Sequence, residues 1–401
     1  MDKVRLESVR RAGTFLAAAA LLGAQGLLAQ TMSKPSGSQD ALELQRTRER
    51  FVKERGAKTF YPADKFDLSP LPAYEPKEKV SGTLRVWGNN YLADSGLSDV
   101  WEAEFRKFHP DIRIEWNLKS AATAVGALWS GVADIGITGR GVLWSERLAF
   151  QRQYSYDITE IVSTTGSYNV AGWSNALGIF VHKDNPIIRL SFSQLDGIFG
   201  AAREGGWGTD FEWHRDVGRG PEKNIRRWGQ VGLKGSWANQ PINPYGLNLR
   251  YEQSLRISNP ILKGSDKWNE RIKLFANFTG ADGKLISAAQ QVMEHISADK
   301  YGIGYGGLMN LTPQTKAIAI AVADAGPYIP LTLETAQDRS YPLIGETYIY
   351  LNRKPGSAID PKIREFVSYV LSRQGQQAVA RDGKYLPLTV AALRAQRQKL
   401  E

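Results

Sequence analysis

Hydroxyl and arginine side chains stand at the two ends of one short stretch of the chain, residues 120–140. Ser120 and Thr123 open a short apolar segment that fits a helix, and a buried strand then ends in Thr138 and, two residues on, Arg140. Helix N-termini present free N–H groups, and in open α/β sheets ligands lie beyond the carboxyl ends of strands. The stretch therefore predicts a binding site for an anion or another small molecule.

Such a site needs a sheet to hold it, and the neighbouring sequence predicts one. Residues 82–88 and 111–116 have the pattern of strands, and residues 97–108 have one apolar face and fit a helix that Pro110 stops. A further strand is expected over residues 132–138. Strands that alternate with helices in this way predict an α/β fold with a mostly parallel sheet and right-handed crossovers.

Length and composition narrow the class of protein. The chain has 401 residues, enough for two domains, with 42% hydrophobic and 23% charged residues. It contains no cysteine, which excludes disulfides, thiolate metal sites and catalytic thiols. Its four histidines show no metal-ligand spacing, so we expect no metal and no cofactor.

The first 29 residues have the pattern of a signal peptide, with a basic start followed by an apolar run. An uncleaved membrane anchor is the alternative, and the pattern leaves Sec and twin-arginine export open. We therefore expect a periplasmic or secreted protein. Residues 30–80 indicate an N-terminal helix followed by a Pro-rich tether.

Net charge favours anionic partners. The formal charge is +10, and four basic and two acidic residues in the first 29 leave +8 for the rest. The basic residues form no dense run and do not alternate with aromatic residues, so nucleic acid is not expected as a partner.

Several pieces of the chain match one family in the same order. They include Leu190-Ser-Phe-Ser-Gln-Leu-Asp-Gly-Ile-Phe-Gly200 and Tyr301-Gly-Ile-Gly-Tyr-Gly306. The matching pieces are residues 82–116, 120–146, 176–186, 190–200, 301–306, 341–351 and 366–380. The chain resembles the extracytoplasmic solute-binding proteins of ABC importers, in particular the phosphate-binding branch with the type II periplasmic fold.

The resemblance implies two lobes, each a mostly parallel sheet flanked by helices, joined by two hinge crossings near residues 176–181 and 338–345. Lobe I would comprise residues 81–178 and 341–401. Lobe II would comprise residues 179–340, with a Trp-rich insertion at 201–240. That insertion could be a lid, a docking surface or a ligand platform, or it could simply pack on its own domain, which we favour.

The resemblance also implies ligand residues in lobe I. Asn89 and Asn90 fall in the family's first ligand loop, although they could merely shape a turn. One hydroxyl near Ser120 or Thr123 touches the anion in the family, although both could act only as helix caps.

The strand end at Thr138 departs from the family pattern. The family has a Ser-Asp pair there, whose Asp accepts the proton of hydrogen phosphate, whereas this chain keeps a hydroxyl in Thr138 but has Gly139 and then Arg140. Arg140 would hold the anion through two hydrogen bonds and a positive charge. Without the Asp, the site would no longer require a proton on the anion. The alternative is that Arg140 pairs with Glu146 or faces solvent.

The anion loop of lobe II also departs from the family. Its Gly-rich pattern is missing, and Asn248, Arg250 and Tyr251 are the residues that could meet an anion there. Arg250 could equally be a simple surface residue.

These features predict a binding protein and not an enzyme. It would capture phosphate or a related oxyanion between its lobes for an ABC permease in the inner membrane, and we expect a monomer. The alternatives are a sensor or scaffold that keeps the fold with an altered anion site, and an extracytoplasmic phosphatase or hydrolase. No metal constellation or Ser/His/Asp order supports the last alternative.

Overall fold

The computed structural model describes residues 41–208 and 212–401. The expected signal peptide and residues 30–40 lie outside the described residues. Within the two described ranges, no helix is both long enough and apolar enough to cross a bilayer. The same ranges contain no group of three or more His, Asp or Glu side chains that could hold a metal ion.

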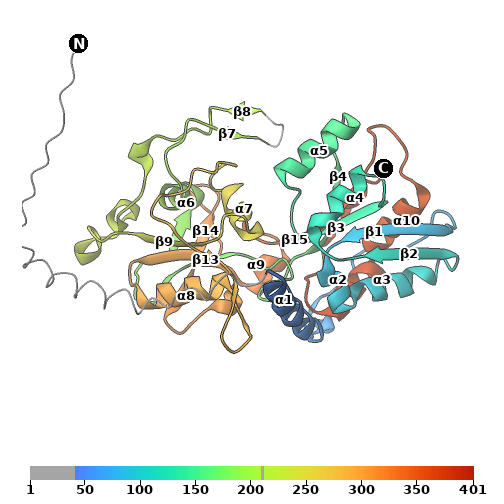
Figure 1. Ribbon diagram of the computed structural model, residues 1–401, viewed down its shortest axis with the longest axis horizontal. Helices are drawn as coiled ribbons and strands as arrows, with labels where there is room; N and C mark the ends of the chain where they lie inside the picture. Colours follow the sequence, from blue (N-terminus) through green and yellow to red (C-terminus); the bar gives the residue numbers. More distant parts are fainter. Residues whose placement is uncertain (1–40, 209–211) are drawn as a thin grey trace, which may run out of the picture.

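Two sheets, side by side, organise the chain (Figure 1). We call the part around the five-stranded sheet lobe I and the part around the six-stranded sheet lobe II. The five-stranded sheet has the order β2-β1-β3-β15-β4 and contains β1 (Gly82–Gly88), β2 (Ile112–Asn117), β3 (Ile135–Thr138), β4 (Thr159–Thr165) and β15 (Glu346–Leu351). The six-stranded sheet has the order β10-β9-β13-β5-β14-β6 and contains β5 (Gly178–His182), β6 (Arg189–Ser191), β9 (Asn243–Leu247), β10 (Lys273–Phe275), β13 (Gly302–Gly306) and β14 (Thr315–Ala321).

Each sheet is parallel except for one strand. In lobe I, β15 runs antiparallel to both β3 and β4, and in lobe II, β5 runs antiparallel to both β13 and β14. These are the two strands that the chain enters directly after passing from one sheet to the other. The predicted fold of two mostly parallel lobes is confirmed.

Helices cover the sheets of both lobes. Those of lobe I are α2 (Asn90–Ser95), α3 (Leu97–Arg106), α4 (Ala124–Trp129), α5 (Trp144–Tyr154), α10 (Pro361–Val370), α11 (Arg373–Asp382) and α12 (Val390–Gln398). Those of lobe II are α6 (Phe192–Phe199), α7 (Glu252–Ser258) and α8 (Ala288–Ala298). Helix α1 (Ala41–Gly56) precedes lobe I, and α9 (Leu333–Gln337) lies between β14 and β15. Helix α3 shows why these segments fold locally, because Leu97, Trp101 and Phe105 recur every four residues and all are fully buried.

The strand predicted over residues 132–138 is shorter than expected. It begins at Ile135, because the N–H groups of Val132 and Ala133 both donate to the carbonyl of Ala127 and so complete the end of α4. The apolar pattern alone does not distinguish that turn from a strand.

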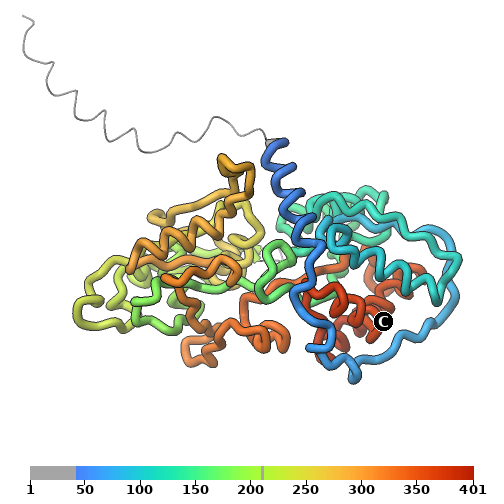
Figure 2. Tube along the Cα trace, turned by 90° about the horizontal axis from the view of Figure 1, so that it is seen from below, coloured from blue at the N-terminus to red at the C-terminus, as the bar shows by residue number. Residues whose placement is uncertain are grey.

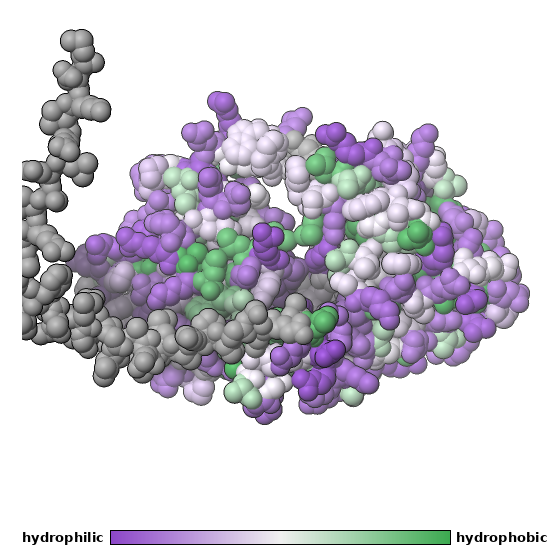
Figure 3. Space-filling model, in the orientation of Figure 1, coloured by the Kyte–Doolittle hydropathy of each residue, from purple (hydrophilic) through white to green (hydrophobic). Residues whose placement is uncertain are grey.

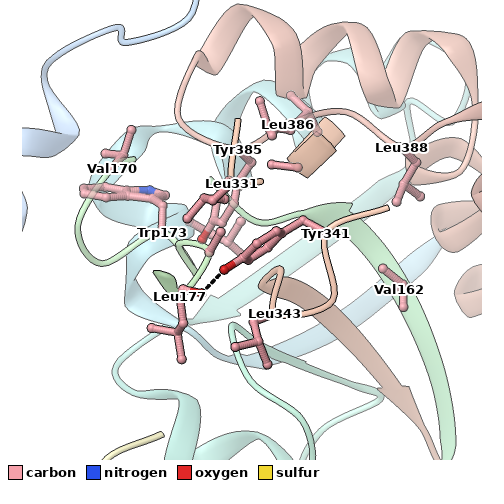
Figure 4. Close-up of a cluster of buried hydrophobic side chains, with 14 of the residues drawn as sticks. Val162, Val170, Trp173, Leu177, Leu331, Tyr341, Leu343, Tyr385, Leu386 and Leu388 are labelled. Carbon is pink, nitrogen blue, oxygen red and sulfur yellow. Dashed lines mark hydrogen bonds between the residues drawn. The ribbon is translucent and has the colours of Figure 1, made fainter. Parts of the chain in front are cut away.

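Two connections join the lobes, one between β4 and β5 and one between β14 and β15. They lie against each other, since Leu177 N–H donates to Leu343 O at 2.9 Å and the Tyr341 hydroxyl donates to Leu177 O at 3.0 Å. Figure 4 shows this second bond inside a cluster of buried side chains that includes Trp173 and Tyr385. The connections therefore form one packed hinge region.

Residues 57–80 run from α1 over lobe I and bury aromatic side chains in it. Tyr74 is 4% exposed, and its hydroxyl bonds both His109 Nε2 and Glu365 Oε2 at 2.7 Å. Tyr61 accepts the backbone N–H of Tyr168, in the first hinge connection, at 2.9 Å. The segment is thus part of the folded body of lobe I.

The insertion at 201–240 packs partly on lobe II. Arg203 and Arg219 are buried and pair with Asp196 of α6, and Trp228 is fully buried. In contrast, Trp207 and Trp213 are about half exposed, on the hairpin formed by β7 (Gly206–Trp207) and β8 (Trp213–His214). The base of the insertion thus packs on lobe II, as we favoured, and in this hairpin the Trp207 ring lies 6.3 Å from the Trp144 ring of α5 in lobe I.

Candidate functional site

The three loops that follow β1, β2 and β3 lie at one edge of the lobe I sheet, because these strands are parallel neighbours. The first and third loops touch the hinge region. The ring of Tyr91 packs edge-to-face on Trp173 at 5.1 Å, and the Ser174 hydroxyl donates to Gly139 O at 2.7 Å. This sheet edge therefore faces the junction of the lobes, where Figure 3 shows the molecule hollowed.

The two asparagines of the first loop hold its shape. Asn89 is 3% exposed, and its Oδ1 accepts the N–H of Tyr91 at 3.1 Å, which caps α2. Asn90 Nδ2 donates to Asp94 Oδ2 at 2.9 Å. Both amide side chains thus have partners within the loop or helix.

The hydroxyls of the second loop act locally in the same way. Ser120 Oγ accepts the N–H of Ala122 at 3.3 Å, and Thr123 Oγ1 donates to Ser120 O at 2.8 Å. Both residues are only partly buried. A hydroxyl oxygen has two lone pairs, so the capping bond leaves capacity for a further contact.

The third loop contains the most strongly engaged charge of the site. The Arg140 guanidinium donates to both carboxylate oxygens of Glu146, at 2.6 and 2.8 Å, and the two side chains are 12% and 11% exposed. Thr138 Oγ1 donates to the carbonyl of Arg140. The pairing of Arg140 with Glu146, which the sequence left open, is present in the structure.

Backbone donors remain available beside this pair. In the described part of the chain, the N–H groups of Gly139, Arg140 and Gly141 donate to no carbonyl or side chain. Consecutive unpaired N–H groups attract anions, and here they follow a buried strand. The loop can therefore offer an anion hydrogen bonds that do not depend on its side chains.

Lobe II contributes the loop after β9. Asn248 Oδ1 accepts the N–H of Arg250 at 3.0 Å, and the Tyr251 hydroxyl accepts the N–H of Asn277 at 2.9 Å. Arg250 is exposed, and its side chain makes no ion pair or hydrogen bond with any described residue. It is thus the predicted residue of lobe II with a fully available charge.

An ion pair on α7 directly follows this loop. Arg256 donates to Asn175 O at 2.9 Å and to Leu343 O at 3.0 Å, one carbonyl in each hinge connection, and its Nε lies 3.4 Å from Glu252 Oε1. Burial raises the pKa of the Glu252 carboxyl, and the positive charges of Arg256 and Arg140 oppose that rise. Arg140 in lobe I thus acts electrostatically on Glu252 in lobe II.

Comparisons with known proteins agree with this architecture. The phosphate-binding protein PstS of Pseudomonas aeruginosa is 30% identical over 319 residues, which cover 79% of this chain and 87% of that protein. The chain belongs to the PstS family. The protein SphX of Synechococcus elongatus is 24% identical over 309 residues, covering 76% of this chain and 77% of that protein. No family model matches the chain.

A solved structure supports the fold of this PstS-family protein. PstS of Borrelia burgdorferi superposes with a TM-score of 0.50 at 16% identity, covering 78% of this chain and all of that one. At this identity the likeness concerns the fold alone. The predicted two-lobed type II periplasmic fold is confirmed.

Two residues beside the candidate site of this PstS-family chain, Glu252 and Arg256, were not predicted from the sequence. Glu252 and Arg256 stand four residues apart on one helix, a spacing that suggests an ion pair and does not distinguish a surface pair from one at a hinge. The partners of Arg256 lie 81 and 87 residues away along the chain. Only the fold brings them together.

Proposed function

We propose that this protein captures phosphate or a related oxyanion between its two lobes and delivers it to an ABC permease in the inner membrane. The observation that carries the proposal is the 30% identity to a protein named phosphate-binding protein PstS over 87% of that protein's length. The hollow at the junction of the lobes and the loops beside it support the proposal that the anion binds there. That relative is named for binding, which supports a binding protein and not an enzyme.

The proposed ligand groups come from both lobes. In lobe I, the unpaired N–H groups of residues 139–141 would meet the anion directly, and Arg250 of lobe II would bring an available charge from the other side. The proposed ligand side chains are those of Asn89, Asn90, Ser120, Thr123, Thr138, Arg140, Asn248, Arg250 and Tyr251. Arg140 would act with part of its charge offset by Glu146.

The setting of the proposed function is the periplasm, with the protein acting as a monomer. The basic start and apolar run of the first 29 residues support export. The excess of positive charge supports an anionic ligand through long-range attraction.

Calorimetric titration and thermal unfolding with phosphate, sulfate, a phosphonate and an organic acid test the proposal. Phosphate at 100 times its Kd should stabilise the folded protein by about 2.7 kcal/mol. We expect this effect with phosphate and little with the organic acid. If no anion binds, the proposal fails.

The sensor or scaffold with an altered anion site is the second candidate function. The bidentate pair of Arg140 with Glu146 favours it, because that pair partly neutralises the charge expected to hold the anion. Absence of binding to every anion, with the fold intact, would select this candidate.

A further inference from the structure

Helix α1 lies across the junction of the lobes, as Figures 1 and 2 show. Its C-terminal end rests on lobe I so closely that a Cβ on Gly56 would come within 2.1 Å of the Asp94 carbonyl oxygen in α2. Its N-terminal half reaches the lobe II hairpin formed by β11 (Phe278–Thr279) and β12 (Leu285–Ile286). One helix therefore touches both lobes.

The contact with lobe II includes hydrogen bonds of polar side chains on α1. Thr47 Oγ1 and Thr279 Oγ1 are 3.3 Å apart, and both residues are buried, at 3% and 8% exposure. Arg50 donates to Gly283 O at 3.4 Å. Both contacts join α1 to the β11–β12 hairpin of lobe II. They can therefore form only when lobe II lies close to α1.

The attachment to lobe I is much stronger. The segment that follows α1 buries Tyr61, Phe66, Leu71 and Tyr74, all at 6% exposure or less, in the core cluster. Because buried aromatic and aliphatic side chains hold far more firmly than two hydrogen bonds, α1 must move with lobe I. The contact with the β11–β12 hairpin then breaks when the lobes separate, as does the ring contact between Trp207 of lobe II and Trp144 of lobe I.

Helix α1 also stands beside the first candidate ligand loop. Burial raises the pKa of the Tyr91 phenol, and the guanidinium of Arg48 on α1 opposes that rise, as a nearby positive charge does. Glu252 of lobe II acts on the same phenol. Groups from α1, lobe I and lobe II thus converge at Tyr91.

We propose that α1 is a strap across the cleft, anchored on lobe I and latched to the β11–β12 hairpin of lobe II by Thr47 and Arg50. These two are positioning residues that limit how far the lobes open. Ligand held between the lobes leaves only when they separate, so the strap sets the rate of release. The statement on release rests on the proposed function, whereas the statement on opening does not.

A crosslink across the latch tests the strap directly. The chain has no cysteine, so Thr47→Cys with Thr279→Cys introduces a single possible disulfide. Mild oxidation should close it, and the oxidised protein should release labelled phosphate at least tenfold more slowly than the same protein after reduction. The matched control is Ser297→Cys with Thr312→Cys, whose hydroxyls are 2.7 Å apart within lobe II. Its oxidation should leave release unchanged.

A second pair of variants needs no crosslink. Thr47→Ala with Arg50→Ala weakens the latch, whereas Arg46→Ala removes an exposed arginine of α1 that has no partner in the described part of the chain. Without phosphate, the first variant should show a larger radius of gyration by X-ray scattering than the second. With phosphate, it should release the ion severalfold faster.

The outcomes separate the two proposals. A latch pair that fails to crosslink while the control pair does, or unchanged scattering in the weakened variant, would overturn the strap. If no form of the protein binds phosphate, the proposed function fails, while crosslinking and scattering still decide whether α1 limits opening.

Discussion

Glu146 offsets part of the positive charge of Arg140 and so weakens its attraction for an anion. Its carboxylate takes both terminal nitrogens of the guanidinium and also accepts the N–H of Leu143. The ion pair is nearly dry, with both side chains at 12% exposure or less. The two readings of Arg140, a ligand clamp and a structural partner, can therefore be separated by altering Glu146 and leaving Arg140 in place.

We predict that Glu146→Gln tightens phosphate binding about fivefold. The change removes a negative charge near the proposed anion, and glutamine can still accept the Leu143 N–H. A fivefold change in Kd corresponds to about 1 kcal/mol. Calorimetric titration measures the change. Glu115→Gln, on the outermost strand β2 of the lobe I sheet, is the control and should have no effect on binding. Unchanged or weaker binding in Glu146→Gln would place Arg140 outside the anion site.

At the scale of elements, a buried network of hydrogen bonds holds the segment between α1 and β1 on lobe I. His109 Nδ1 accepts the Val80 N–H at 3.3 Å, His109 Nε2 contacts the Tyr74 hydroxyl, and that hydroxyl donates to Glu365. Burial lowers the pKa of His109, with Lys79 adding to the decrease and Glu365 opposing it. The folded protein thus binds a proton at His109 less readily than the unfolded chain does.

The lowered pKa makes stability fall in acid. Below about pH 6.5 the unfolded chain protonates His109 while the folded protein does not, so the free energy of unfolding drops until the folded pKa is passed. Each unit of pKa difference is worth about 1.4 kcal/mol. Urea unfolding at pH 7.5 and 5.0 should show a smaller acid-induced loss in His109→Gln than in the parent protein. Parallel losses in the two proteins would contradict the assignment.

The sequence predicted the elements well where their pattern is local. Helix α3 and strands β1 and β2 follow directly from alternation and from residues four apart, and the collinear pieces predicted the two lobes. The contacts of α1 with the β11–β12 hairpin could not be predicted, because Thr47 and Thr279 are 232 residues apart and neither belongs to a recognisable motif. The same holds for Arg256, whose pattern indicates a charge on a helix without showing which carbonyls it binds.

At the scale of the whole molecule, the two lobes are linked by more than the chain itself. Arg256 holds the two hinge connections through Asn175 O and Leu343 O, and Glu252 neutralises it from the same helix. Helix α7 carries these residues directly after Arg250, the proposed charge of lobe II. The orientation of that charge towards lobe I thus depends on how α7 is fixed to the hinge.

Arg256→Lys should loosen this link while keeping the charge. A lysine ammonium cannot reach two carbonyls with the fixed fork of a guanidinium, so one charged hydrogen bond is lost, which costs about 1.5–3 kcal/mol of unfolding free energy. Because α7 then holds Arg250 less firmly towards lobe I, phosphate affinity should fall as well. Arg397→Lys is the matched control, since Arg397 donates to Leu371 O within lobe I, and it should leave affinity unchanged. Urea unfolding and calorimetric titration of both variants measure the two effects, and lost stability with unchanged affinity in Arg256→Lys would show that the hinge bonds stabilise the fold without orienting the site.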